Sequence, residues 1–122
     1  MPTKPVNLSA ILKAAGVESQ LELLLLNRLD QAGLPLGETQ VYGIPGRLFK
    51  FDRAWKEQRV AVNVQGAIYV RGGHSTGVGI ERDCEVACLA ALSGWRYLPV
   101  TRKQIESGKA IEWIARALGV DL

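Results

Sequence analysis

The sequence has few of the residues on which several classes of protein depend. Its 122 residues include two cysteines and one histidine, and no apolar run approaches the roughly 20 residues that a membrane-spanning helix needs. Two cysteines cannot form the disulfide framework of a small secreted protein. The first residues, Met1-Pro-Thr-Lys, lack the apolar core of a signal peptide. We therefore expect a cytoplasmic protein with reduced thiols.

The overall composition is typical of one globular domain. Apolar residues make up 48% of the chain and charged residues 22%, which favours a packed core over disorder. We expect a single domain over residues 1–122, with a core at about 18–100 and C-terminal helices over 101–119.

Positive charge is concentrated in the middle of the chain. The formal net charge is +3, and residues 44–82 alone carry seven basic and three acidic side chains. Clustered arginine and lysine suit a phosphate backbone. A solvated protein surface would give the same pattern, so charge alone leaves both interpretations open.

Apolar spacing predicts helices over residues 8–15, 19–32 and 80–93. Ser19 and Glu22 fit a capping box at the start of the second helix, and Gly33 ends it. Further along, Thr101 and Gln104 fit another capping box, and a cap at residue 107 followed by a stop at residue 119 predicts a last helix. The first two helices do not favour a helix-turn-helix, because the second is rich in leucine and suits a core rather than a DNA groove.

Alternating or short apolar segments predict strands over residues 38–42, 47–52, 59–65 and 95–100. Residues 53–58 are expected to turn the chain, and the glycine-rich residues 66–79 to form a loop. Val60, Val62 and Val64 share the predicted buried face. The order α-α-β-β-β-α-β-α-α predicts an α/β (α+β) fold with a four-stranded mixed sheet flanked by helices.

Polar residues on the predicted hairpin are the first candidates for chemistry. In the expected register Asp52 lies near Asn63 and Gln65, and oxygen ligands of this kind can hold a divalent cation for phosphodiester cleavage. A surface aspartate at a strand end is the competing interpretation. Glu22 is explained by its capping box unless it points across the sheet towards Asp52. His74 is either incidental or, near Asp52, a general acid–base.

The two cysteines do not predict a zinc site. Cys84 and Cys88 lie four residues apart on one helix, and with His74 they would give at most three ligands. We expect them to pack the helix against the sheet as small apolar residues.

Several short segments, in the same order, resemble known nucleases. They are Phe49–Trp55, Val60–Gly66, Gly72–His74, Glu81–Glu85 and Ala90–Arg96. Together they resemble small phage and prophage nucleases of the restriction-endonuclease-like PD-(D/E)XK superfamily, and they are similar to relatives of very-short-patch repair endonucleases. The resemblance covers about residues 18–100, and it implies a cytoplasmic protein of a bacterial or phage-infected cell.

The resemblance implies a restriction-endonuclease-like core that binds Mg²⁺ or Mn²⁺ and cleaves DNA. The metal aspartate falls on Asp52, the second carboxylate position on Asn63 and the lysine-or-glutamine position on Gln65. The Val64 carbonyl is expected to assist at the metal. The helix glutamate of the family corresponds to Glu22 and the loop histidine to His74.

Two departures from the family pattern matter. Asn63 stands where glutamate is expected, and Val86 stands where the small phage group often has lysine. An asparagine lends a carbonyl oxygen without charge, which favours weaker metal binding. The basic side chains expected to hold DNA phosphates are Arg47, Lys50, Arg53, Arg71 and Arg82.

Three functional hypotheses follow. The first is a metal-dependent DNA endonuclease, acting on linear DNA or on branched recombination and repair intermediates. A homodimer is expected if both strands are cut. The second is a nucleic-acid-binding module on the same fold with weakened or lost catalysis, and the third is an interaction protein with no nucleic-acid role.

Overall fold

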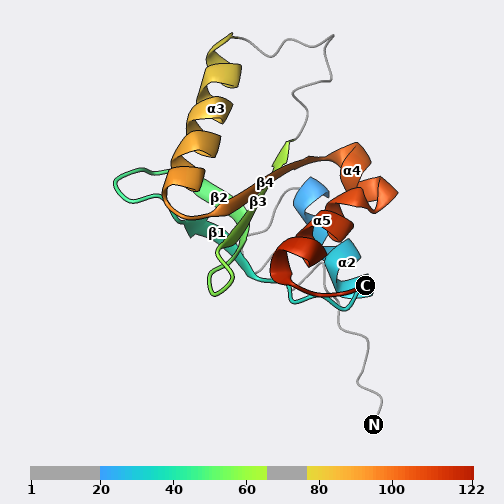
Figure 1. Cartoon of the computed structure of the whole chain (residues 1–122). Coiled ribbons are helices and arrows are strands. Elements are labelled where there is room, and N and C mark those ends of the chain that lie inside the picture. Colours follow the sequence, from blue (N-terminus) through green and yellow to red (C-terminus); the bar gives the residue numbers. More distant parts are fainter. Residues whose placement is uncertain (1–19, 66–76) are drawn as a thin grey trace.

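The computed structural model describes residues 20–65 and 77–122 (Figure 1). The predicted helix over residues 8–15 lies outside the described residues, as do Ser19, Arg71 and His74. Glu22, Asp52 and the hairpin residues are all described.

The described chain forms a four-stranded sheet in the order β1-β2-β3-β4. The strands are β1 (Glu38–Tyr42), β2 (Lys50–Trp55), β3 (Val60–Gln65) and β4 (Arg96–Thr101). Neighbouring strands are antiparallel from β1 to β3, whereas β3 and β4 are parallel. Helix α3 (Gly77–Leu92) lies in the connection between these parallel strands, so the predicted mixed sheet and α+β class are confirmed.

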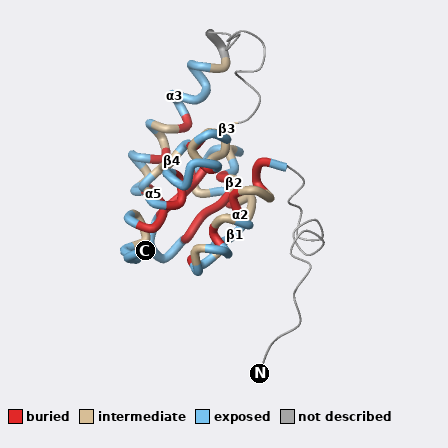
Figure 2. Tube along the Cα trace, turned by 90° about the vertical axis from the view of Figure 1, so that its right-hand side faces the viewer, coloured by how far each residue is buried: buried red, intermediate tan, exposed pale blue. Residues whose placement is uncertain are grey.

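Helices cover both faces of the sheet. Helix α3 lies on one side, and α2 (Gln20–Gln31), α4 (Arg102–Ser107) and α5 (Lys109–Leu118) lie on the other (Figure 1). Val60 and Val62 are fully buried towards α2, α4 and α5, while Ala61 between them is buried towards α3. Buried residues therefore run along the central strands in Figure 2, and the predicted valine face is confirmed.

The position of β2 differs from the prediction. The expected strand over 47–52 begins at Lys50 and continues to Trp55, and the turn occupies residues 56–59. Arg59 has a positive φ of 58° in this turn. The prediction placed the strand too early because Arg53, a charged residue, occupies a buried position in it. Trp55 holds the end of the strand by donating its Nε1–H to the Pro35 carbonyl at 2.8 Å.

The C-terminal helices follow their capping signals closely. Thr101 and Gln104 form the predicted capping box, with hydrogen bonds of 3.3 and 3.0 Å. Gly108, rather than Ser107, is the N-cap residue of α5, and the Ser107 hydroxyl accepts from the Lys109 N–H at 3.3 Å. Gly119 ends α5 in the left-handed conformation, as expected.

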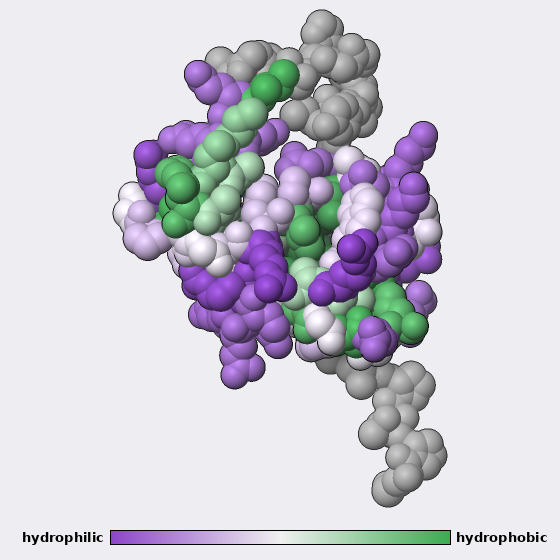
Figure 3. Space-filling view, viewed as in Figure 1, coloured by the Kyte–Doolittle hydropathy of each residue, from purple (hydrophilic) through white to green (hydrophobic). Residues whose placement is uncertain are grey.

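The expectation that the cysteines pack α3 against the sheet is wrong. Cys84 and Cys88 are both exposed, and Val86 and Ala90 are buried instead. The four-residue spacing was compatible with any side of the helix, and α3 is apolar on more than one side. Ile80 and Leu92 of this helix are exposed, and Figure 3 shows a green, hydrophobic stretch along α3. In the part of the chain that the structure describes, no helix is long and apolar enough to cross a membrane.

Candidate functional site

Where β2 and β3 separate, hydrogen bonds from side chains take the place of the backbone hydrogen bonds between the strands. The two strands pair from Trp55–Val60 to Arg53–Val62. One step further, the Asp52 N–H donates to Asn63 Oδ1 at 2.9 Å, and the Val64 N–H donates to Asp52 Oδ2 at 2.8 Å. We call this place, formed by Asp52, Asn63 and Val64, the fork. The prediction that the hairpin brings Asp52 beside Asn63 is confirmed.

The regular alternation of β2 breaks at the fork. Phe51 and Arg53 would share one face of a regular strand, yet Phe51 is buried on the α3 side while Arg53 lies near Glu22 of α2. In the β1–β2 register Gln40 lies opposite Asp52, between the pairs Thr39–Arg53 and Val41–Phe51. Gln40 has a positive φ of 54°, which is uncommon for a residue with a side chain. Both Asp52 and Arg53 interact with Glu22 of α2.

Glu22 meets Asp52 at this position. It lies in the first turn of α2 with 8% of its surface exposed, and the Gln40 side chain donates to Glu22 Oε1 at 3.2 Å. The pKa of Glu22 is raised from 4.5 to about 7, chiefly by burial and then by a hydrogen bond with Asp52 and repulsion from its charge, while Arg53 and Gln40 oppose the increase. The Glu22 carboxyl group therefore titrates near neutral pH. The interpretation of Glu22 as pointing towards Asp52 is confirmed.

Arg53 lies in the interior beside these carboxyl groups. Its surface is 5% exposed, burial lowers the pKa of its guanidinium, and the Glu22 carboxylate counteracts that change. A buried guanidinium does not lie on a surface where DNA phosphates would bind. Arg53 is therefore better described as a charge partner of Glu22 than as the phosphate contact expected from the sequence.

The amide of Asn63 is engaged on both sides. Its Oδ1 accepts from the Asp52 N–H, and its Nδ2 donates to the Tyr97 hydroxyl at 3.0 Å. Burial raises the pKa of Tyr97, and the charges of Asp83 and Asp52 add to this effect while the Asn63 hydrogen bond opposes it. Tyr97 and Gln40 were not predicted as site residues. An aromatic residue on a short apolar strand gives only a core signal, and Gln40 gives none.

Gln65 ends β3 two residues beyond Asn63, opposite Thr101 of β4, and is partly buried. It extends the polar edge of the fork along the same strand. The structure thus gathers Glu22, Asp52 and Asn63, with Gln65 nearby on β3.

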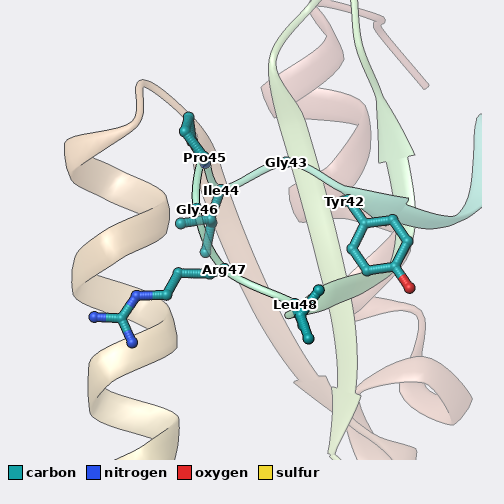
Figure 4. Close-up of a pocket in the computed structure, with 7 residues that line it drawn as sticks. All are labelled: Tyr42, Gly43, Ile44, Pro45, Gly46, Arg47 and Leu48. Atoms are coloured by element: carbon teal, nitrogen blue, oxygen red, sulfur yellow. The ribbon is translucent and has the colours of Figure 1, made fainter.

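Basic residues surround the loop that leads from β1 to the fork. Residues 42–48 line a pocket, and Arg47 extends from it towards α3 (Figure 4), where it forms an ion pair with Glu85 at 3.3 Å. Lys50 Nζ lies 5.2 Å from the ring centre of Tyr42, and the Arg82 guanidinium lies 5.7 Å from that of Phe49. Arg47, Lys50 and Arg82 are exposed. Lys50 is two residues from Asp52 in the sequence, whereas Arg47 lies towards α3 and Arg82 lies on it.

The donor groups decide what this site can do chemically. Glu22 and Asp52 offer hard oxygen ligands, which Mg²⁺ and Mn²⁺ prefer, or they share a proton. No group of three or more His, Cys, Asp or Glu side chains suited to a metal occurs within residues 20–65 and 77–122. Neither a scan against protein-family models nor a search of curated proteins finds a match for this chain.

Proposed function

We propose that this chain is a divalent-metal-dependent endonuclease that cleaves DNA phosphodiester bonds, built on a restriction-endonuclease-like core. The observation that carries the proposal is the pairing of the Glu22 and Asp52 carboxyl groups at the fork. A carboxyl group with a pKa near 7, beside a second carboxyl group, favours a functional site over a structural one. The three antiparallel strands followed by a helical connection to a parallel fourth strand also support it.

The residues fit Mg²⁺ or Mn²⁺. Mg²⁺ sites often use one or two carboxylates and take further oxygens from water and substrate phosphate, so two carboxyl groups are enough on the protein side. Repulsion from Asp52 contributes to the raised pKa of Glu22, and a cation bound by both carboxylates would offset that repulsion. Asp52 and Glu22 would hold the ion, with the Val64 carbonyl as a further oxygen. A bound ion would polarise the scissile phosphate and activate water.

The remaining residues would position the substrate. Asp52 accepts a hydrogen bond from the Val64 N–H, and Gln65, at the end of β3, would orient water. Arg47, Lys50 and Arg82 would neutralise phosphates beside the fork. Arg71 and His74 keep the roles expected from the sequence, as a phosphate contact and as an acid–base.

The test is a cleavage assay on linear and branched DNA with Mg²⁺, Mn²⁺ or EDTA. We expect cutting that needs metal and is lost in Asp52→Ala. Glu57→Ala, at an exposed position in the β2–β3 turn, serves as the matched control and should cut like the wild type. Equal cutting in EDTA, or full activity of Asp52→Ala, would refute the proposal.

A nucleic-acid-binding module without catalysis is the second candidate. The engaged, uncharged amide of Asn63 favours it, because a carboxylate there would have added a charged metal ligand. This alternative predicts salt-dependent DNA binding by the wild type and by Asp52→Ala, with no cleavage of any substrate by either protein.

A further inference from the structure

The orientation of the Asn63 amide is dictated by its neighbours. The Asp52 backbone N–H can only donate, so the atom of Asn63 facing it at 2.9 Å must be the oxygen. The Nδ2 atom is then the one that faces the Tyr97 hydroxyl at 3.0 Å. The Tyr97 oxygen accepts this hydrogen bond. Both ends of the amide are therefore committed to protein groups on different strands.

This amide connects three strands at the point where two of them separate. Asp52 belongs to β2, Asn63 to β3 and Tyr97 to β4. Backbone pairing between β2 and β3 runs only as far as Arg53–Val62. Without the Asn63 oxygen, the partly buried Asp52 N–H would lose this partner, and an unmade bond of this kind is costly.

Tyr97 is held where its hydroxyl can orient the amide. Its ring centre lies 5.9 Å from that of Phe51, the residue before Asp52, and Phe51 in turn packs edge-on against Trp95 at 5.1 Å. The ring position is thus set by the buried aromatic residues on the α3 side. The Asn63 amide links this hydroxyl to the Asp52 N–H by hydrogen bonds.

We infer that Asn63 is a positioning residue rather than a metal ligand, and that Tyr97 is a second positioning residue that orients the Asn63 amide so that Asp52 faces Glu22 in a fixed geometry. The metal role of Asp52 and Glu22 rests on the function proposed above. The tie between the three strands is a property of the folded chain and stands independently of that function.

Two measurements test the inference without relying on cleavage. The first is hydrogen exchange of the Asp52 amide, and the second is Mn²⁺ affinity by calorimetry. Both are measured for Tyr97→Phe, Asn63→Ala, the double variant and Asn63→Asp. Tyr42→Phe, on the exposed side of β1, and Asn27→Ala, on the exposed side of α2, are the matched controls.

We expect Asp52 exchange to accelerate about tenfold in Tyr97→Phe and in Asn63→Ala, the scale of one lost hydrogen bond. Mn²⁺ affinity should fall several-fold in both variants. Because Tyr97 acts through Asn63, the double variant should be no worse than Asn63→Ala, whereas independent effects would add. Asn63→Asp should keep Asp52 exchange slow, since a carboxylate accepts from the same N–H and the Tyr97 hydroxyl can turn to donate to it.

The opposite results would overturn the inference. If Asn63→Ala loses Mn²⁺ affinity while Tyr97→Phe binds Mn²⁺ like the wild type, Asn63 is a ligand. If Asp52 exchange is unchanged in both single variants, the tie does not position Asp52. A wild-type protein that neither binds Mn²⁺ nor cleaves DNA would refute the proposed nuclease, and in that case the exchange measurement alone decides the inference.

Discussion

Replacing Glu22 by glutamine should make the protein more stable at neutral and alkaline pH. Glutamine is the uncharged counterpart of a protonated glutamate. Its oxygen can accept from Gln40, and its NH₂ group can donate to Asp52, as a protonated Glu22 would. The substitution removes the need to ionise a carboxyl group beside another one in the interior. The difference in unfolding free energy between Glu22→Gln and the wild type therefore measures what the ionised Glu22 costs the folded protein.

The sign and size follow from the pKa. Burial and Asp52 raise the Glu22 pKa from 4.5 to about 7, so between these values the folded protein binds more protons than the unfolded chain. The contribution is fully present below pH 4.5 and is lost as the pH rises to about 7. Each pKa unit corresponds to about 1.4 kcal/mol, so the total loss is about 3 kcal/mol.

The assay is urea denaturation of the wild type and Glu22→Gln at intervals from pH 4.5 to 8. We expect the two proteins to have similar free energies of unfolding at the acidic end. Glu22→Gln should then gain on the wild type through the window, to an advantage of about 3 kcal/mol above pH 7. Glu112→Gln, at an exposed position on α5, is the control and should differ from the wild type by a small, pH-independent amount.

A difference between Glu22→Gln and the wild type that stays constant from pH 4.5 to 8 would refute the reasoning, because it would mean that Glu22 titrates normally. Divalent metal adds a second check. A ligand that binds only the folded state stabilises it in proportion to the logarithm of its concentration. We expect millimolar Mn²⁺ to stabilise the wild type at pH 7.5 more than Glu22→Gln.

Three further changes test other parts of the site. DNA affinity should fall steeply between about 50 and 200 mM salt in a binding gel, and a flat salt dependence would contradict any nucleic-acid role. Lys50→Gln should weaken DNA binding more than Lys109→Gln does, because Lys50 adjoins the fork. His74→Ala should slow metal-dependent cleavage about 10²-fold while DNA binding is retained, as for a general acid–base, and an unchanged rate in a single-turnover assay would make His74 incidental. Gly43→Ala should destabilise the fold by about 1–3 kcal/mol in urea, because a Cβ at this position would lie 2.7 Å from Trp95 Cζ2, and a wild-type midpoint would contradict that packing.

The sequence predicted the elements that depend on local pattern. Alternation located β3, and the capping pair Thr101 and Gln104 located α4, because both signals arise from residues close together in the chain. The offset of β2 arose from a buried charge. A charged residue such as Arg53 is usually found in an exposed turn. Its burial here is compensated by the charge of Glu22, some 30 residues earlier in the chain.

The candidate site was predictable only where it depends on one hairpin. The proximity of Asp52 and Asn63 follows from the register of two consecutive strands. Tyr97 comes from a strand that is placed by a long connection, and Gln40 reaches Glu22 through an unusual backbone conformation. Neither contact has a signature in the sequence, because each joins two elements that are far apart in the chain.

The parallel pairing of β3 with β4 has a consequence for how the molecule assembles. The β2–β3 hairpin needs only the short turn at residues 56–59, whereas 30 residues separate Gln65 from Arg96 across the α3 connection. Loop-closure entropy grows with the length of the intervening chain, and non-local pairings slow folding. We expect the hairpin, with its Asp52–Asn63 contact, to form early and β4 to dock late.

The contacts at the fork should therefore be completed in sequence during refolding. Tyr97 can meet Asn63 only after β4 has docked, and the Glu22 carboxyl group loses water only when α2 packs over the sheet. Proton uptake by Glu22 would then be a late event, which stopped-flow refolding in a weakly buffered dye solution at pH 6 can time against the burial of Trp95. The hairpin expected to form early thus carries Asp52, but only the fully folded chain has both carboxyl groups of the Glu22–Asp52 pair.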